Sequence, residues 1–293
     1  MADSFPPSSF DRAIPAAFVV LWASGFLVAR AVATHAEPLT FLTARLALTT
    51  LVFCAIAIVA RAAWPGTLRG WGDALISGVL LQGMYLGGVF WAARHGLPAA
   101  LIALVAGLQP LLTAALAYPL LGERVSARRW LGIGLGSAGT ALVLLPRLGS
   151  GAGIPKDAIV AAFAAMIAIT FGTIWQKRRS AQSDLRTNAA IQFLGAALVM
   201  APAAALTEHG QFDGSWAVWS ALLWSVFGLS VGAISLLLVL IKRGAVAGVA
   251  SLFYLTPAVT ALMAFVLVGE SLSPVQVSGM AVAAAGVALA SRN

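Results

Sequence analysis

The chain has 293 residues, of which 60% are hydrophobic and only 10% are charged, and its mean hydropathy is +0.94. A water-soluble domain carries about 25% charged residues, so this composition excludes a soluble globule. Ten spans of about 20 residues would use most of the chain and leave no room for a separate catalytic or nucleic-acid-binding domain. We therefore predict an all-α membrane protein.

The uncharged runs of the sequence predict ten transmembrane helices. Most runs reach or approach the length of about 20 residues that is needed to cross the hydrocarbon core. In chain order, the predicted helices lie near residues 14–33, 39–60, 73–93, 98–121, 128–145, 157–176, 187–206, 216–240, 246–268 and 274–291.

The basic residues of the loops predict the orientation. If the N-terminus is cytoplasmic, thirteen arginine and lysine residues fall in cytoplasmic segments and four in outer segments. This bias follows the positive-inside rule, so we expect a multi-pass protein of the cell inner (plasma) membrane with both termini in the cytoplasm. The same rule accounts for the net charge of +8, and we expect no nucleic-acid partner. The basic run at 177–179 is expected to anchor the topology, next to membrane lipids.

A duplication relates the two halves of the chain at a fixed offset of 147 residues. The first half contains Pro110, Gly122-Glu123, Ser126, Gly132 and Gly139, and the second contains Pro257, Gly269-Glu270, Ser273, Gly279 and Gly286. We predict two five-helix repeats, 1–147 and 148–293. Because five is odd, the second repeat enters the membrane from the opposite side. Inverted repeats are typical of secondary transporters, whose site lies at the repeat interface near the middle of the bilayer.

The segments at 22–26 and 37–41, followed by Arg45, resemble the opening of an EamA domain, and the duplicated tails resemble its close. Over nearly its whole length the chain resembles the ten-helix exporters of the drug/metabolite transporter superfamily. Within that group it is most similar to amino-acid and metabolite exporters, including YddG-type exporters of aromatic amino acids. The second copy departs from the first, because Ile169 stands opposite Trp22 and Gln192 opposite Arg45.

Pro110 and Pro257 are expected near the middle of two predicted helices, where they would break the helix. Proline removes a backbone donor, and the freed carbonyl must find another partner or line a wet cavity. Matched interruptions in both halves point to a transport site, although each proline could also be a simple structural kink. The polar residues next to them are candidates for substrate contact.

Further candidates are polar and aromatic residues at membrane depth. Gln82 and Tyr85 are three residues apart, so we expect them on one helical face. A buried glutamine could equally make an interhelical hydrogen bond. The predicted substrate-binding residues are Trp22, Ser24, Gln82, Tyr85, Gln109, Thr173, Trp175, Ser251, Tyr254 and Thr256.

Charged groups are scarce at membrane depth. Only Arg45 is expected deep in a span, where it could attract a substrate carboxylate or play a structural role. Glu123 and Glu270 lie at helix ends and are, like Arg45, candidates for a gate or coupling residue, or for a structural ion pair. Without a carboxylate in mid-membrane, we expect downhill facilitated transport.

The expected function is export of small amphipathic metabolites, most of all amino acids including aromatic ones, by alternating access through a central cavity. The alternatives are a multidrug or lipid-linked substrate carrier and a proton-coupled antiporter. The sequence has no convergent acid/base or metal-ligand set, so we expect neither an enzyme nor a metal or other cofactor. Small-residue faces on the helices predicted at 128–145 and 274–291 are expected to serve as scaffold or homodimer contacts.

Overall fold

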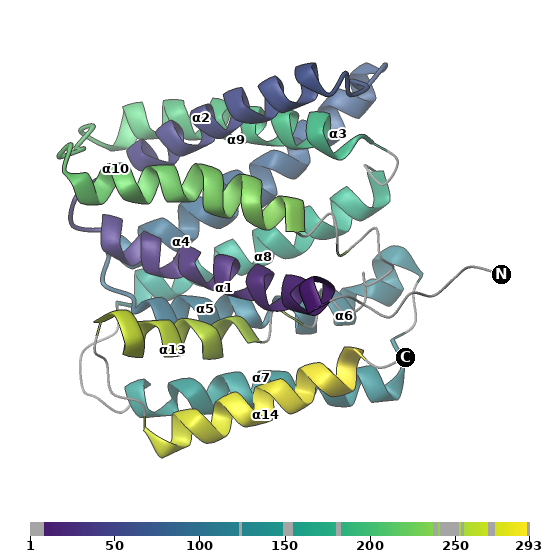
Figure 1. The fold of residues 1–293 in the computed structure, drawn as a ribbon, viewed down its shortest axis with the longest axis vertical. Helices are drawn as coiled ribbons and strands as arrows, with labels where there is room; N and C mark the ends of the chain where they lie inside the picture. Colours follow the sequence, from purple (N-terminus) through teal and green to yellow (C-terminus); the bar gives the residue numbers. More distant parts are fainter. Residues whose placement is uncertain are drawn as a thin grey trace.

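The computed structural model describes residues 9–122, 125–148, 155–179, 183–236, 240, 252, 255–268 and 273–291. Apart from an isolated bridge between Ala36 and Phe212, this part of the chain has no β structure. The helices lie side by side, and most of their connections gather at the two ends of the bundle (Figure 1). The protein is therefore all-helical over the described residues, as its composition predicts.

The first half of the chain begins with α1 (Ser9–Val32) and α2 (Pro38–Val59). The next span is continuous but of mixed type, with the segments α3 (Leu68–Gly78), η1 (Val79–Met84) and α4 (Tyr85–Arg94). The half closes with α5 (Ala99–Gly107), α6 (Gln109–Leu121) and α7 (Ala127–Leu148).

The second half contains α8 (Lys156–Arg179) and α9 (Leu185–Thr207). It continues with α10 (Trp216–Leu223), η2 (Trp224–Ala233), α13 (Thr256–Val268) and α14 (Pro274–Ser291). The predicted helix 246–268 contains α13, and most of its first part, residues 246–255, lies outside the described residues. The described residues also exclude Glu123, Glu270, Ser251 and Tyr254.

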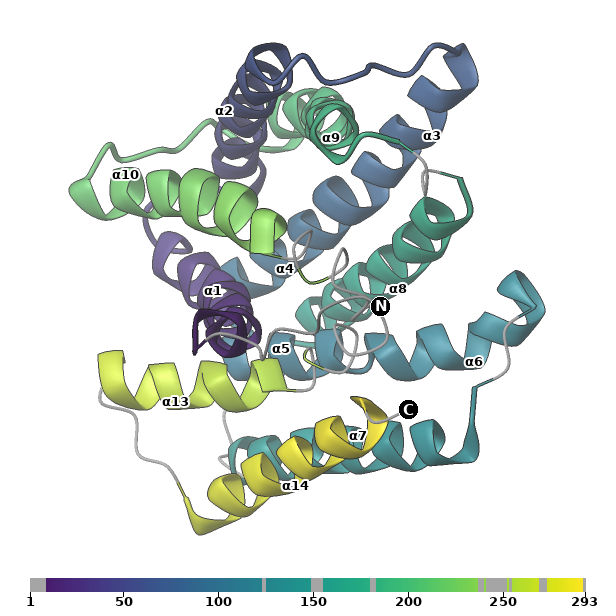
Figure 2. The ribbon, with the colours of Figure 1, turned by 45° about the vertical axis from the view of Figure 1, so that its right-hand side comes forward.

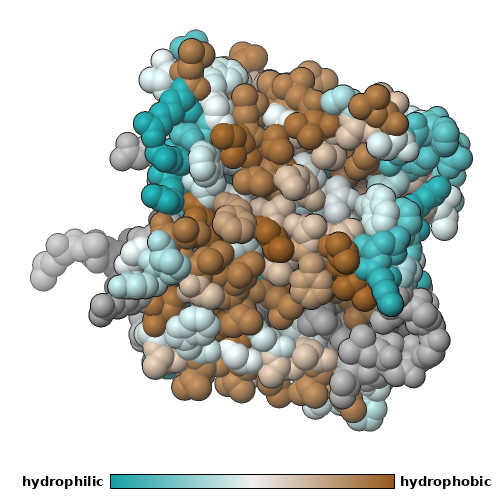
Figure 3. Space-filling view, turned by 180° about the vertical axis from the view of Figure 1, so that it is seen from behind, coloured by the Kyte–Doolittle hydropathy of each residue, from teal (hydrophilic) through white to brown (hydrophobic). Residues whose placement is uncertain are grey.

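Six helical stretches of the described chain are long and apolar enough to cross a membrane. They are Ile14–Val32, Pro38–Val59, Leu68–Arg94, Lys156–Arg179, Leu185–Thr207 and Trp216–Leu236. One face of the molecule carries a broad hydrophobic band across the middle of the helices, with hydrophilic residues towards the two ends (Figure 3). This distribution is expected for a helical bundle whose middle contacts the lipid core and whose two ends contact water.

The predicted helix 98–121 is two segments rather than one. Helix α5 ends at Gly107 and α6 begins at Gln109, so the interruption falls just before Pro110. Pro110 has no N–H for the carbonyl of Ala106, and its ring clashes with that carbonyl. The proline therefore occupies the second position of a new helix, where a missing N–H costs little. In the second half, Pro257 is likewise the second residue of α13.

Two spans contain a π-helical segment, which no sequence pattern predicted. Segment η1 covers Val79–Met84, and the 147-residue offset moves this range to 226–231, inside η2 at Trp224–Ala233. A π-turn bonds residue i to i+5, and such segments are frequent at functional sites. In η2, the Ser230 hydroxyl donates a hydrogen bond of 3.0 Å to the carbonyl of Ser225, five residues earlier.

Helices α7 and α14 pack against each other at one edge of the bundle (Figures 1 and 2). The approach is so close that a Cβ added at Gly139 would lie 2.6 Å from the carbonyl oxygen of Gly279. A Cβ at Gly286 would lie 2.8 Å from the carbonyl oxygen of Gly132. The small-residue faces that we expected to be scaffold or dimer contacts are thus used within one chain.

The loops after α1 and α9 bind each other; we call residues 33–38 and 208–215 the loop clasp. The Glu37 carboxylate accepts hydrogen bonds of 2.9 Å from the backbone N–H groups of His209 and Gln211. In return, the Glu208 carboxylate accepts bonds of 2.9 and 2.7 Å from the N–H groups of Leu39 and Thr40, at the start of α2. The two carboxylates therefore tie the two halves of the chain together.

The loop clasp is expected to weaken in acid. The N–H of Gln211, followed by that of His209, holds the pKa of Glu37 below its ordinary value of 4.5. A lowered pKa stabilises the folded state above pH 4.5, and this contribution is lost as the pH falls through the folded-state pKa. We therefore expect Glu37→Gln to lower the melting temperature of the purified protein at about pH 7 and to have a smaller effect at about pH 4.

A matched control is Asp157→Asn, which removes an exposed acid at the start of α8, outside the loop clasp. We expect it to lower the melting temperature at about pH 7 less than Glu37→Gln does, because Asp157 does not join the two loops. An effect of Glu37→Gln that grows towards acid pH would contradict the assigned role of this carboxylate.

Candidate functional site

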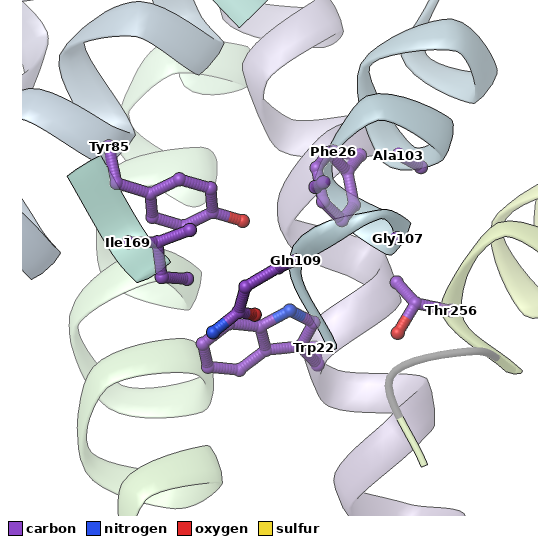
Figure 4. A pocket seen from close by; sticks show the side chains of 9 residues that line it. Trp22, Phe26, Tyr85, Ala103, Gly107, Gln109, Ile169 and Thr256 are labelled. Carbon is purple, nitrogen blue, oxygen red and sulfur yellow. The ribbon is translucent and has the colours of Figure 1, made fainter. Parts of the chain in front are cut away.

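A small cavity lies in the interior of the bundle. Its lining comes from α1, α4, α5, α6, α8 and α13, and consists of Trp22, Phe26, Tyr85, Ala103, Ala106, Gly107, Gln109, Ile169 and Thr256. Figure 4 shows the hydroxyl of Tyr85, the amide of Gln109 and the ring of Trp22 in this lining. The volume open to the centre of a water-sized molecule is about 10 Å³, which is close to the minimum for one water.

The cavity lies about midway along the helices. At a rise of about 1.5 Å per residue, Trp22 lies roughly 15 Å from the end of α1 at Val32. Tyr85 lies roughly 14 Å from the end of α4 at Arg94 by the same measure. Half of a hydrocarbon core is about 15 Å thick, so the cavity falls near the middle of the membrane.

The interruption of the fourth predicted span shapes the cavity wall. Gly107 ends α5, Gln109 begins α6, and both residues line the cavity together with Ala106. The carbonyl of Ala106 is the one that Pro110 cannot satisfy. Irregular backbone at membrane depth is tolerated where it lines a cavity. The interruption between α5 and α6 therefore lies at a position where an unpaired carbonyl costs little free energy.

Both halves of the chain contribute equivalent positions to the cavity. The 147-residue offset relates Trp22 to Ile169 and Gln109 to Thr256, and all four residues line it. The pairs share position but differ in chemistry, because an indole faces an aliphatic side chain and an amide faces a hydroxyl. The cavity is therefore built at the junction of the two duplicated segments, with unlike walls.

The polar groups of the cavity are few. The Gln109 amide donates a hydrogen bond of 3.3 Å to the Thr173 hydroxyl, which itself donates to the carbonyl of Ile169 at 2.7 Å. The Thr256 hydroxyl oxygen is buried and has no hydrogen-bond partner in the described part of the chain. A buried hydroxyl without a partner is costly, so Thr256 is well suited to bind a polar group that enters the cavity.

Four of the predicted substrate-binding residues that the structure describes are not in the lining, although one of them, Thr173, accepts the hydrogen bond from Gln109. The Ser24 hydroxyl accepts a hydrogen bond of 2.9 Å from the Trp224 indole N–H, so it joins α1 to η2. Gln82 falls within η1, where the three-residue spacing of an α-helical face does not apply, and it is not part of the lining. Trp175 lies near the end of α8, where the guanidinium of Arg179 is 5.6 Å from its ring centroid.

Sequence reasoning missed five lining residues, namely Phe26, Ala103, Ala106, Gly107 and Ile169. Ile169 could have been found, because the repeat offset places it opposite Trp22. The others are apolar or small and carry no chemical signal in a chain that is rich in such residues. Only the packing of α1 against α5 distinguishes them from ordinary core residues.

Comparison with known proteins places the chain in a family. The profile of the EamA-like transporter family matches it twice, over residues 14–145 and 157–292. A probable amino-acid metabolite efflux pump of Salmonella typhimurium is 30% identical over 280 residues, which cover 92% of this chain and 90% of that protein.

Two further likenesses agree with this result. The uncharacterized inner membrane transporter YedA of Escherichia coli K12 is 28% identical over 265 residues, which cover 89% of this chain and 83% of that protein. A protein crystal structure superposes with a TM-score of 0.74 at 24% sequence identity, covering 94% of this chain and 95% of the other, and so shares the fold. The chain belongs to the EamA-like transporter family and is a multi-pass inner-membrane transporter.

Proposed function

We propose that this transporter exports small amphipathic amino acids, including aromatic ones, by alternating access through the cavity between Trp22 and Ile169. The observation that carries the proposal is a mid-membrane cavity with aromatic walls and few polar groups, lined by equivalent positions of both halves. An aromatic or aliphatic side chain suits the walls, and the polar end of an amino acid suits the Gln109 amide and the Thr256 hydroxyl. The relative in Salmonella, a probable amino-acid metabolite efflux pump, supports this substrate class.

Transport by this route requires a change of conformation. The cavity now has room for about one water, which is far less than an amino acid occupies. We propose that the two five-helix repeats have inverted topology, so that two near-equivalent packings open the cavity to either side in turn. None of the described residues that line the cavity is acidic, and we propose that movement is downhill rather than driven by a proton gradient.

The test is uptake by purified protein in liposomes of labelled phenylalanine, tryptophan, leucine and alanine, with and without an imposed pH gradient. We expect downhill uptake of the aromatic and aliphatic amino acids without the gradient. Uptake only with the gradient would overturn facilitated transport in favour of a proton-coupled antiporter. No uptake of any amino acid would overturn the substrate class, and multidrug and lipid-linked substrates would form the next panel.

A pair of variants tests whether the cavity is the route. Tyr85→Ala removes a ring from the cavity wall and is expected to lower the uptake rate several-fold, since well-placed aromatic contacts dominate binding energy. Tyr118→Ala removes a tyrosine on α6 that is 59% exposed and lies outside the lining, so we expect little change. Equal rates for both variants and the wild type would remove this cavity from the proposed route.

A further inference from the structure

Arg45 is a buried cation within a membrane span. It lies on α2, about 10 Å along the helix from Pro38 at a rise of about 1.5 Å per residue, and its side chain is 5% exposed. Ionisable residues at membrane depth are costly, and they are usually paired or functional. The question is therefore what balances this charge.

The described residues satisfy Arg45 poorly. One of its terminal nitrogens donates a long hydrogen bond of 3.4 Å to the Ser230 hydroxyl, and its Nε is buried without a partner in the described chain. A guanidinium has five N–H donors, so most of this capacity is unused here. Burying a charge without a counter-ion is costly, and an anion bound at this position would offset that cost.

Six acidic residues have side chains that the structure describes, and all six are engaged elsewhere. Glu37 and Glu208 bind backbone in the loop clasp, and Asp213 pairs with His35 at 2.6 Å. The remaining three are Asp73, which lies 3.9 Å from Arg69, Asp184, which pairs with Arg186, and Asp157, which accepts from the N–H of Ala158. No ion pair within the described ranges includes Arg45, and the position is open to an anion from outside the chain.

Tyr85 connects this cation to the cavity. Its side chain is buried in the cavity wall, and its hydroxyl points into the space in front of Gln109 and Trp22 (Figure 4). The Arg45 charge is near enough to Tyr85 for the two groups to interact electrostatically. Helix α2 also packs against both α4 and η2, which carry Tyr85 and Ser230. A ligand in the cavity that reaches past Tyr85 would therefore approach Arg45.

The second half of the chain carries no charge at the position equivalent to Arg45. The 147-residue offset places Gln192 opposite Arg45, and Gln192 is buried on α9 to the same extent, at 5% exposed. The same offset places Gly232 opposite Tyr85. The neutral amide of Gln192 is accommodated at the equivalent position, so the buried cation and the neighbouring phenol occur only in the first half of the chain. A purely structural role would not require that difference.

We propose that Arg45 and Tyr85 form a carboxylate-binding subsite at the edge of the cavity, which restricts transport to substrates that bear a carboxylate. The guanidinium binds the carboxylate through charge-assisted hydrogen bonds, and the Tyr85 hydroxyl donates a further one. The side chain of the substrate then lies against Trp22, Phe26 and Ile169. This subsite rests on the proposed amino-acid function and makes its substrate class more specific, because the subsite would reject amides and amines of the same shape.

The experiment compares phenylalanine with two ligands that each change one group, 3-phenylpropionate without the amino group and phenylalaninamide without the acid group. Phenylalanine, 3-phenylpropionate and phenylalaninamide are added to the purified wild type and to Arg45→Gln, and binding is followed by thermal unfolding over a range of ligand concentrations. We expect both carboxylates to raise the melting temperature of the wild type, with phenylalaninamide binding about tenfold more weakly or worse. In Arg45→Gln, we expect the carboxylates to bind about as weakly as the amide.

Two further variants control for loss of structure. Tyr85→Phe keeps the ring and removes only the hydroxyl, and is expected to weaken the carboxylates several-fold and the amide less, because the bond to a charged acceptor is the stronger one. Arg30→Gln removes an exposed cation from the end of α1 and is expected to bind all three ligands as the wild type does. If Arg45→Gln fails to fold, the change in carboxylate selectivity of Tyr85→Phe decides whether the subsite exists.

The outcomes separate this subsite from the proposed function. Equal binding of phenylalanine and its amide by the wild type, or carboxylate selectivity that survives in Arg45→Gln, would overturn the subsite and leave amino-acid export standing. A wild type stabilised by neither carboxylate would also overturn the subsite. In that case, the liposome uptake panel decides independently whether amino acids are substrates at all.

Discussion

Replacing Ile169 by tryptophan is expected to lower amino-acid uptake about tenfold or more. Ile169 lines the cavity from α8, and its repeat counterpart Trp22 already places an indole there. The space between them has room for about one water, so a second indole would occupy the volume that a substrate needs. A tenfold lower rate corresponds to about 1.4 kcal/mol of added barrier for a substrate that must pass the second indole.

The matched control lies two residues earlier on the same helix, on the opposite face. Ile167 is 45% exposed on the outer surface of α8, where a tryptophan would contact lipid rather than the cavity. Ile167→Trp is therefore expected to transport at the wild-type rate. The measurement is the initial rate of labelled phenylalanine uptake in liposomes, with thermal unfolding of each variant to establish that it is folded. An Ile169→Trp protein that is folded and fully active would show that substrates do not pass this wall.

Gly139→Ala is expected to destabilise the protein by about 1–3 kcal/mol, the usual cost of overpacking. The added Cβ would lie 2.6 Å from the carbonyl oxygen of Gly279 and would also press on the backbone N–H of Ala283. Real Cβ atoms do not approach backbone so closely, and backbone cannot move aside as a flexible side chain can. Helices α7 and α14 would have to separate, which loses the close packing between them.

Gly134 provides the control for this change. It lies on α7 as well, but a Cβ added there meets no heavy atom within 4 Å. Gly134→Ala is expected to be neutral or to stabilise by up to about 1 kcal/mol, because alanine is the better helix former. Thermal or denaturant unfolding of both variants in detergent gives the comparison. Equal stability of the two variants would mean that α7 and α14 do not pack through Gly139.

Prediction from sequence succeeded for features that depend on a single residue type or on a long uncharged run of residues. The predicted span 39–60 corresponds to α2 at Pro38–Val59, and the predicted span 187–206 to α9 at Leu185–Thr207. These limits follow from the length that a lipid core demands of an uncharged helix. Membership of the EamA-like family could also be inferred from short motifs, because they recur at one offset in both halves.

Prediction failed where backbone geometry depends on neighbouring helices. Gln82 was expected on one face with Tyr85, but it lies in a π-helical segment. The interruption at Leu108, by contrast, adjoins Pro110, where the sequence predicted a break in the helix. Periodicity arguments assume a uniform α-helix, so they misplace side chains wherever the helix changes type. Trp175 was chosen for its chemistry; it lies near the end of α8 beside Arg179, outside the cavity lining, and its role in transport stays a prediction.

The sequence alone determined that this chain is a helical membrane protein, that its two halves are duplicates, and that it carries the motifs of its transporter family. Those properties depend on composition, run length and repeated residues, which are local quantities. Only the tertiary structure decided that Trp22, Ile169, Gln109 and Thr256 meet in one cavity, and that Arg45 is buried without a described counter-ion. Contacts of this kind join helices far apart in the chain, and they depend on how close-packed side chains and backbones fit together.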